Sequence, residues 1–304
     1  RELILDVAES WVCFGIDGWR LDVAEEVGAD FWREFHTRVR AADPEAYLVA
    51  EVWTHKPDWL GGGMFDAFMN YPLTRAILGF SAQGHWDGSQ RMPVGYQGED
   101  AIVPLSGAGF WARVEELQGL HDPAVTAVQL NLLASHDTPR VLTLCSGDLD
   151  SVRLAMLLQM TLPGAPCIYY GDEIGLAGSM DPDCRGAFPD DPAEWEREPS
   201  AWLTDLAALR HSSRAFRDAE LTLLGTNGDA VAYLRRDRDE AFAVVANAEG
   251  HELDWAVDLP VEVRAAELVP LRGGNPGPRS ARVDGDRLQV RLPRRDGVVV
   301  RLSS

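Results

Sequence analysis

Short apolar segments alternate with amphipathic segments along the first two thirds of the chain. Helical spacing of apolar residues places Leu3, Val7 and Trp11 on one face of a helix at the start, and it predicts further helices over 31–42, 109–121, 149–162 and 199–216. Nearly continuous apolar runs predict strands over 15–23, 46–53, 64–70, 128–134 and 166–171. This alternation favours a parallel sheet that is buried on both faces.

The pattern changes after residue 217. Alternating or β-branched residues predict short strands over 229–236, 241–247, 252–259, 265–271 and 287–302. Turn residues, such as Asn227-Gly228 and the run from Gly273 to Pro276, separate them. We therefore expect two domains, an α/β domain over 1–217 and a small antiparallel β-sandwich over 218–304.

Composition narrows the classes of function. The chain has 28 basic and 48 acidic side chains and a formal net charge of −20, which opposes binding to nucleic acid or to an anionic membrane. No apolar run is long enough to cross a bilayer. The four cysteines lack CxxC or metal-ligand spacing, and Cys13 and Cys167 lie in apolar runs where we expect them to be buried.

Three acidic residues stand at or just beyond the ends of predicted strands: Asp22 after GIDGWRL, Glu51 in LVAEVW and Asp137 after NLLASH. In a parallel α/β barrel, catalytic groups lie at the carboxyl ends of the strands. One acid alone would more simply be a helix cap or a surface residue. Three at successive strand ends favour glycoside hydrolysis, in which one carboxylate attacks the sugar and another group protonates the leaving oxygen.

The motifs GIDGWRLDVAEEV, LVAEVW and NLLASHDTPR resemble, in this order, motifs of the alpha-amylase family of glycoside hydrolases. The segments GMFDAFMNYPLT, SHDTPRVLTL and PCIYYGDEIGLAGSMDPDCR are most similar to the cyclomaltodextrinase, neopullulanase and maltogenic amylase group. The resemblance implies a (β/α)8 TIM barrel followed by an all-β sandwich. The family's third-strand motif, which ends in Asn-His, does not precede Asp22, so we expect only the C-terminal five or so of the eight barrel units here and an inactive fragment.

The resemblance also assigns roles to single residues. Asp22 would attack the anomeric carbon, and Glu51 would act as the acid/base. Asp137 would hold substrate hydroxyls and favour the oxocarbenium-like transition state. Arg20 lies two residues before Asp22, on the same face of a strand, and would keep it ionised. His136 would donate a hydrogen bond to a sugar hydroxyl.

Three further residues have two readings each. Asp181 and Arg185 resemble a pair that binds a more distant sugar, but they could equally form a salt bridge within their loop. Trp53 lies two residues after Glu51 and could stack on an acceptor sugar, or it could be a buried strand aromatic.

The function implied by the resemblance is retaining hydrolysis of α-1,4-glucosidic bonds in maltooligosaccharides, cyclodextrins or related starch fragments. An α-glucosyl transferase or isomerase on the same scaffold is the first alternative, and a non-catalytic glucan-binding protein is the second. The expected partner is an α-glucan oligosaccharide, with a homodimer formed through a further N-terminal domain. We expect no cofactor and no metal from these residues, and a cytoplasmic location.

Overall fold

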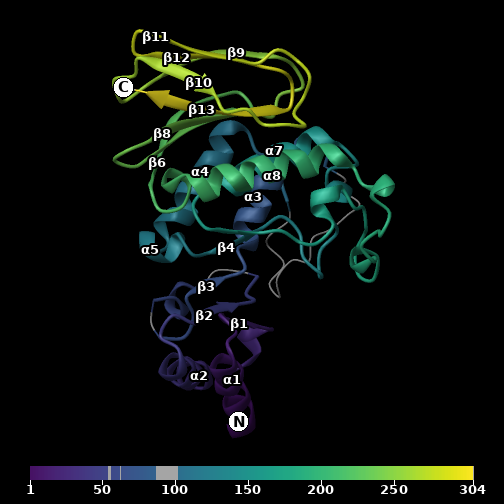
Figure 1. Cartoon of the computed structure of the whole chain (residues 1–304), viewed down its shortest axis with the longest axis vertical. Helices are drawn as coiled ribbons and strands as arrows, with labels where there is room; N and C mark the ends of the chain where they lie inside the picture. The colour runs from purple at the N-terminus through teal and green to yellow at the C-terminus, as the bar shows by residue number, and fades with distance from the viewer. Residues whose placement is uncertain (54–55, 62, 87–101, 304) are drawn as a thin grey trace.

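A computed structural model describes residues 1–53, 56–61, 63–86 and 102–303. Its architecture has an N-terminal arc of parallel strands, a layer of helices, and a C-terminal pair of antiparallel sheets (Figure 1). Within the described residues, no helix combines the length and the apolar character needed to cross a bilayer.

The parallel arc is built from strands in chain order. Strands β1 (Gly18–Leu21), β2 (Tyr47–Ala50) and β3 (Ala67–Phe68) pair side by side, and β4 (Leu130–Leu132) pairs with β5 (Ala165–Cys167). A parallel bridge from Met69 to Leu130 joins the two sets. This succession is a segment of the (β/α)8 barrel expected from the sequence.

Local sequence signals begin and end the helices that cover this arc. The side chain of Asn70 accepts a hydrogen bond from the backbone N–H of Leu73 at the start of α3, and Ser106 and Asp148 cap α4 and α7 in the same way. Gly15 ends α1 with a φ of 114°, which favours glycine. The α-helices are α1 (Glu2–Phe14), α2 (Ala29–Ala42), α3 (Tyr71–Ser81), α4 (Gly107–Gly119), α5 (Pro123–Thr126), α6 (Val141–Leu144), α7 (Leu149–Thr161) and α8 (Arg197–Ser212).

Short 3-10 turns complete the helical part of the described chain. They are η1 (Ala24–Glu26), η2 (Pro57–Trp59), η3 (Asp172–Ile174), η4 (Asp183–Arg185), η5 (Pro192–Glu194) and η6 (Arg214–Phe216). Two of them matter for the site below, because η3 follows β5 and η4 holds Arg185.

The C-terminal part is a sandwich of two antiparallel sheets. One has the order β10-β13-β8-β7-β6 and the other β11-β12-β9. Residues such as Ala232, Val245 and Val290 form the core between them. The strands are β6 (Glu220–Asn227), β7 (Ala230–Arg236), β8 (Ala241–Asn247), β9 (Leu253–Asp258), β10 (Ala265–Leu268), β11 (Ser280–Asp284), β12 (Arg287–Leu292) and β13 (Asp296–Ser303).

The larger sheet is buried on its second face as well. Tyr233 and Val244 belong to the same hydrophobic core as residues of α3, α4, α7 and α8. Gly297 of β13 lies so close to α7 that a Cβ atom there would stand 2.2 Å from Cδ2 of Leu157. The sandwich and the barrel helices therefore share one core.

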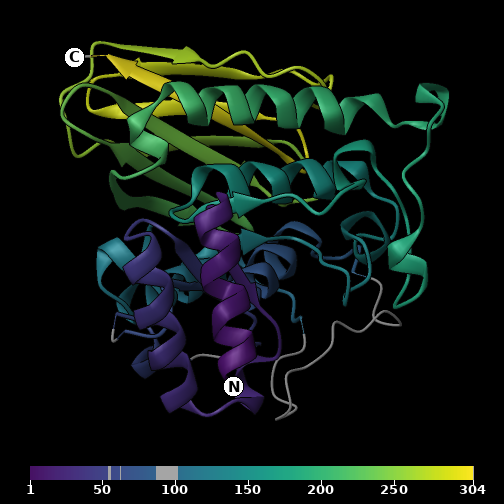
Figure 2. The same cartoon turned by 60° about the horizontal axis from the view of Figure 1, so that its bottom comes forward.

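The structure corrects several details of the sequence prediction. Helix α1, which lies at the front in Figure 2, buries Leu5, Ala8 and Val12. The face with Leu3, Val7 and Trp11 is exposed, and Trp11 is 49% exposed. Cys13 is exposed and Cys167 is only partly buried. The sequence analysis did not identify α3, β6 or β11, and the predicted strand over 287–302 is two strands, β12 and β13.

Candidate active site

The predicted site residues come from the carboxyl ends of the parallel strands. Asp22 directly follows β1, and Glu51 directly follows β2. Asp137 lies beyond β4 in a tight turn, where the backbone N–H of Ser135 donates to the hydroxyl of Thr138 at 2.8 Å and the N–H of Asp137 donates to the hydroxyl of Ser135 at 3.2 Å. Because parallel strands end at the same edge, these three carboxylates share one side of the arc.

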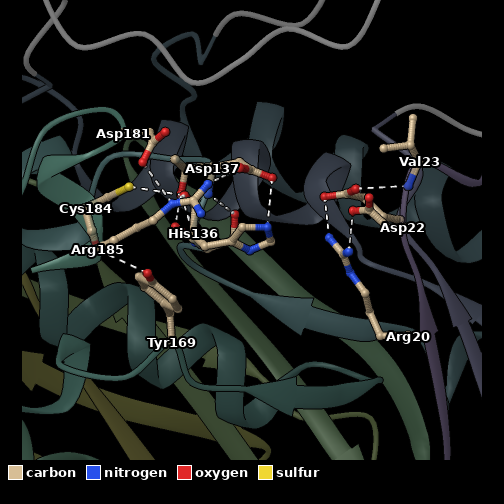
Figure 3. A network of polar contacts seen from close by, with 12 residues as sticks. Arg20, Asp22, Val23, His136, Asp137, Tyr169, Asp181, Cys184 and Arg185 are labelled. Atoms are coloured by element: carbon tan, nitrogen blue, oxygen red, sulfur yellow. Dashed lines mark hydrogen bonds and ion pairs between the residues drawn. The ribbon is translucent and has the colours of Figure 1, made fainter. Parts of the chain in front are cut away.

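Arg20 links the first two carboxylates. Its Nη1 donates to Oδ1 of Asp22 at 2.6 Å (Figure 3). Its Nη2 lies 2.6 Å from Oε1 of Glu51. The second contact is a close ion pair without hydrogen-bond alignment, since neither of its two atoms has a hydrogen-bond partner. One guanidinium thus fixes both side chains at the same time.

The two carboxylates differ in their proton affinity. The hydrogen bond from Arg20 holds the pKa of Asp22 below its ordinary value, while Asp22 remains largely exposed. Burial raises the pKa of Glu51, which is only 4% exposed, against the opposing effects of Arg20 and of the N–H of Val23, 3.3 Å from Oε2. Such a pair keeps one group ionised and favours a proton on the other, as a nucleophile and a general acid require.

His136, Asp137 and Arg185 form the second half of the site. Nε2 of His136 lies 3.1 Å from Oδ2 of Asp137, and Nη2 of Arg185 donates to Oδ1 of Asp137 at 3.2 Å (Figure 3). Arg185 also pairs with Asp181 through its Nε atom at 2.9 Å. The loop salt bridge considered for Asp181 and Arg185 is therefore present, and it extends to Asp137.

The two halves meet at Glu51. Ligand-type atoms of Glu51, His136 and Asp137 lie within 4.8 Å of one another, close enough to surround a small ion. However, Arg20 already compensates Glu51, and Arg185 compensates Asp137. Arg20 is shared with Asp22, and Arg185 is shared with Asp181, so each guanidinium offsets the charge of only one of its two carboxylates.

Trp53 packs beside this site rather than inside the carboxylate cluster. Its ring stacks on Tyr71 at a centroid distance of 3.8 Å and an interplanar angle of 7°, so one face of the ring is occupied. The hydroxyl of Tyr71 donates to that of Ser135 at 3.1 Å, which connects Trp53 to the turn that holds Asp137.

Comparison with known proteins decides the family. The model of the alpha-amylase catalytic domain matches residues 1–220. The chain belongs to the alpha-amylase family. It is 38% identical over 277 residues to a cyclomaltodextrinase of Geobacillus thermopakistaniensis and 37% identical over 262 residues to neopullulanase 2 of Thermoactinomyces vulgaris. These alignments cover 90% and 86% of this chain but only 44% and 42% of the relatives, so the chain spans less than half of their length.

Solved structures of the family agree with this assignment. The native debranching enzyme of Nostoc punctiforme superposes with a TM-score of 0.89 at 36% identity, over 99% of this chain and 61% of its own. A cyclic alpha-maltosyl-(1→6)-maltose hydrolase of Arthrobacter globiformis gives 0.78 at 33% identity, over 98% of this chain and 58% of its own. This alpha-amylase family chain therefore corresponds to about three fifths of each of these two structures.

The sequence analysis missed the buried residues that pack against the site residues. Tyr71 and Ser135 are both buried, and Arg140, three residues after Asp137, has no exposed surface. Ser135 and Arg140 stand within the motif NLLASHDTPR and could have been singled out there. Tyr71 carries a weaker signal, since it only follows the helix cap Asn70.

Proposed function

We propose that this chain carries the catalytic centre of a retaining glycosidase that cleaves α-1,4-glucosidic bonds in maltooligosaccharides, cyclodextrins or related α-glucans. The observation that carries the proposal is the shared contact of Arg20 with two carboxylates whose pKa values move in opposite directions. The names of the cyclomaltodextrinase and neopullulanase relatives support the glucan substrate.

In the proposed first step, a carboxylate oxygen of Asp22 attacks the anomeric carbon. The glycosidic C–O bond breaks, and Glu51 gives its proton to the departing sugar oxygen. Arg20 favours this arrangement because it holds Asp22 in the ionised form, while the burial of Glu51 favours its protonated form.

In the second step, Glu51 takes a proton from water, and the water oxygen displaces Asp22 from the anomeric carbon. The product keeps the α configuration, because two displacements each invert the centre. Asp137 and His136 would hold sugar hydroxyls next to the cleaved bond, and Arg185 with Asp181 would contact the neighbouring sugar. A sugar hydroxyl in place of water would give transglycosylation through the same intermediate.

Two substitutions test the assignment in the natural polypeptide that contains this chain. Asp22→Asn and Glu51→Gln keep the shape of each side chain, but Asn cannot attack the anomeric carbon and Gln cannot give a proton to the leaving oxygen. Each should therefore lower kcat for maltotriose, on the order of 10⁴-fold for the nucleophile. Asp190→Asn is the matched control, because Asp190 is an exposed residue outside the site, and it should leave kcat unchanged.

The stereochemistry gives an independent check. Nuclear magnetic resonance of the first-formed sugar should show the α-anomer, and an initial β-product would overturn the retaining mechanism. An Asp22→Asn variant with a tenth of the normal kcat would show that Asp22 is not the nucleophile. Product analysis with maltotriose separates hydrolysis from transfer, since transfer yields saccharides longer than the substrate.

A further inference from the structure

A buried arginine lies directly behind the site. The side chain of Arg140 is 0% exposed, its Nη1 donates to the carbonyl oxygen of Tyr170, and this nitrogen lies 3.8 Å from Oδ1 of Asp172. The guanidinium carbon stands 4.8 Å and 4.7 Å from the ring centres of Tyr169 and Tyr170, within the range of cation–π attraction. Arg140 therefore fixes the segment that follows β5.

That segment in turn holds the loop with the distal sugar-binding candidates. The hydroxyl of Tyr169 donates to the carbonyl of Cys184 at 3.1 Å, and the hydroxyl of Tyr170 donates to the carbonyl of Gly186 at 2.9 Å. The backbone N–H of Arg140 donates to the carbonyl of Gly178 at 2.9 Å. The loop over 178–186 is thus attached to Arg140 and its two tyrosines at both of its ends.

The same loop contacts the turn that presents His136 and Asp137. The thiol of Cys184 donates to the carbonyl of His136 at 3.2 Å, and Nε of Arg185 donates to the same oxygen at 3.1 Å (Figure 3). Nη2 of Arg185 reaches Asp137 itself. A chain of direct contacts therefore runs from Arg140 through Tyr169 and the loop to Asp137.

We propose that Arg140, supported by Asp172, is a positioning residue that holds the 178–186 loop against Asp137. An effect of Arg140 on catalysis rests on the proposed function, whereas its effect on the position of the loop does not. Stability alone accounts poorly for this pair, because Nε and Nη2 of Arg140 and Oδ1 of Asp172 are buried without hydrogen-bond partners. A buried pair of this kind is weak evidence for stability, and well-packed apolar residues in its place are often no less stable.

The alkylation rate of Cys184 tests the structural part in this chain. Cys184 has no exposed surface while the loop is held. Cys145, which is also buried and directly follows α6, serves as an internal reporter of loosening that extends beyond the loop. In Arg140→Met, iodoacetamide labelling followed by mass spectrometry should show Cys184 reacting at least tenfold faster, with Cys145 unchanged. Arg140→Lys keeps the charge and should restore part of the protection.

Arg235→Met is the matched control. Arg235 is equally buried, but it donates to the carbonyls of Thr161 and Ala219, away from the loop. It should leave the ratio of Cys184 to Cys145 labelling as in the wild type. If Arg140→Met leaves Cys184 protected, or if Cys184 and Cys145 accelerate together, Arg140 only fills the core and the proposal is wrong.

A second measurement separates this proposal from the proposed function. In the natural enzyme, Arg140→Met should lower kcat/KM for maltotriose at least tenfold, mainly through kcat, because Asp137 is expected to act in the transition state. An inactive wild type would refute the proposed function and leave the labelling result intact. If Arg140→Met leaves kcat unchanged although Cys184 is alkylated faster, the loop does not influence catalysis and this part of the proposal is wrong.

Discussion

The close approach of β13 to α7 leads to a sharp stability prediction. Gly297→Ala places a Cβ atom 2.2 Å from Cδ2 of Leu157, 3.2 Å from the carbonyl oxygen of Val245 and 3.3 Å from Cδ1 of Leu154. Carbon atoms pack best at about 3.5–4.0 Å, so Leu157 would have to move by more than an ångström, roughly. Leu157 is fully buried and has little room to do so.

The expected cost follows from overpacking of a dense core. Forcing one methyl group into such a site costs about 1–3 kcal/mol of folding free energy. Leu157→Ala alone removes buried carbon atoms and should cost about 2–5 kcal/mol. In the double variant, the smaller side chain removes the clash, so the combined loss should be smaller than the sum of the two single losses by about 1–3 kcal/mol.

Urea denaturation of the four proteins measures this coupling. Gly119→Ala is the control, because a Cβ there meets no atom within 4 Å, and this variant should be neutral or more stable by up to about 1 kcal/mol. If Gly297→Ala unfolds at the wild-type urea concentration, or if the two single losses simply add, the reasoning fails. The sandwich would then not pack on α7 as closely as the structure indicates.

Two further predictions concern protons. Arg20→Gln removes the hydrogen bond that holds the pKa of Asp22 low, so this pKa should rise. The acidic limb of the kcat/KM profile should then move to higher pH. An acidic limb at the wild-type pH would show that Arg20 does not set the pKa of Asp22. Burial raises the pKa of Asp172 to about 8, so between pH 4 and 8, roughly, the folded chain holds a proton that the unfolded chain releases. Asp172 therefore contributes a loss of stability as pH rises through this window, by at most about 1.4 kcal/mol per pH unit. Asp172→Asn removes this contribution, so its stability should fall less with rising pH, or rise more, than that of the wild type in urea titrations; equal slopes would refute the prediction.

The sequence predicted the arc of strands well because buried parallel strands are apolar on both faces. It failed for α3, in which every residue from Tyr71 to Ser81 is buried, so no polar face marks the helical period. It also missed β11, although Ser280–Asp284 alternates polar and apolar residues as an exposed strand does, so this strand could have been predicted. For α1, a helix with apolar residues on several sides, periodicity could not tell which face packs against the strands.

Some residues of the site could also be predicted from the sequence, and others could not. Asp22, Glu51 and Asp137 could be predicted because strand ends bring acidic residues together, and the structure shows Glu51 beside Asp137 and joined to Asp22 through Arg20. Their catalytic roles stay predictions. Arg140 escaped attention because an arginine in a loop sequence is normally a surface residue, and only the packing of two tyrosines around it shows its burial.

The exposed face of α1 has a consequence for the colloidal behaviour of the protein. Leu3, Trp11 and Phe14 present apolar surface to solvent, and exposed apolar patches favour association between protein molecules. At neutral pH the net charge of −20 keeps copies apart. That repulsion vanishes near the isoelectric point of about 4.7 and weakens in concentrated salt. We therefore expect acid or high-salt conditions to favour self-association of this chain through the exposed apolar residues of α1.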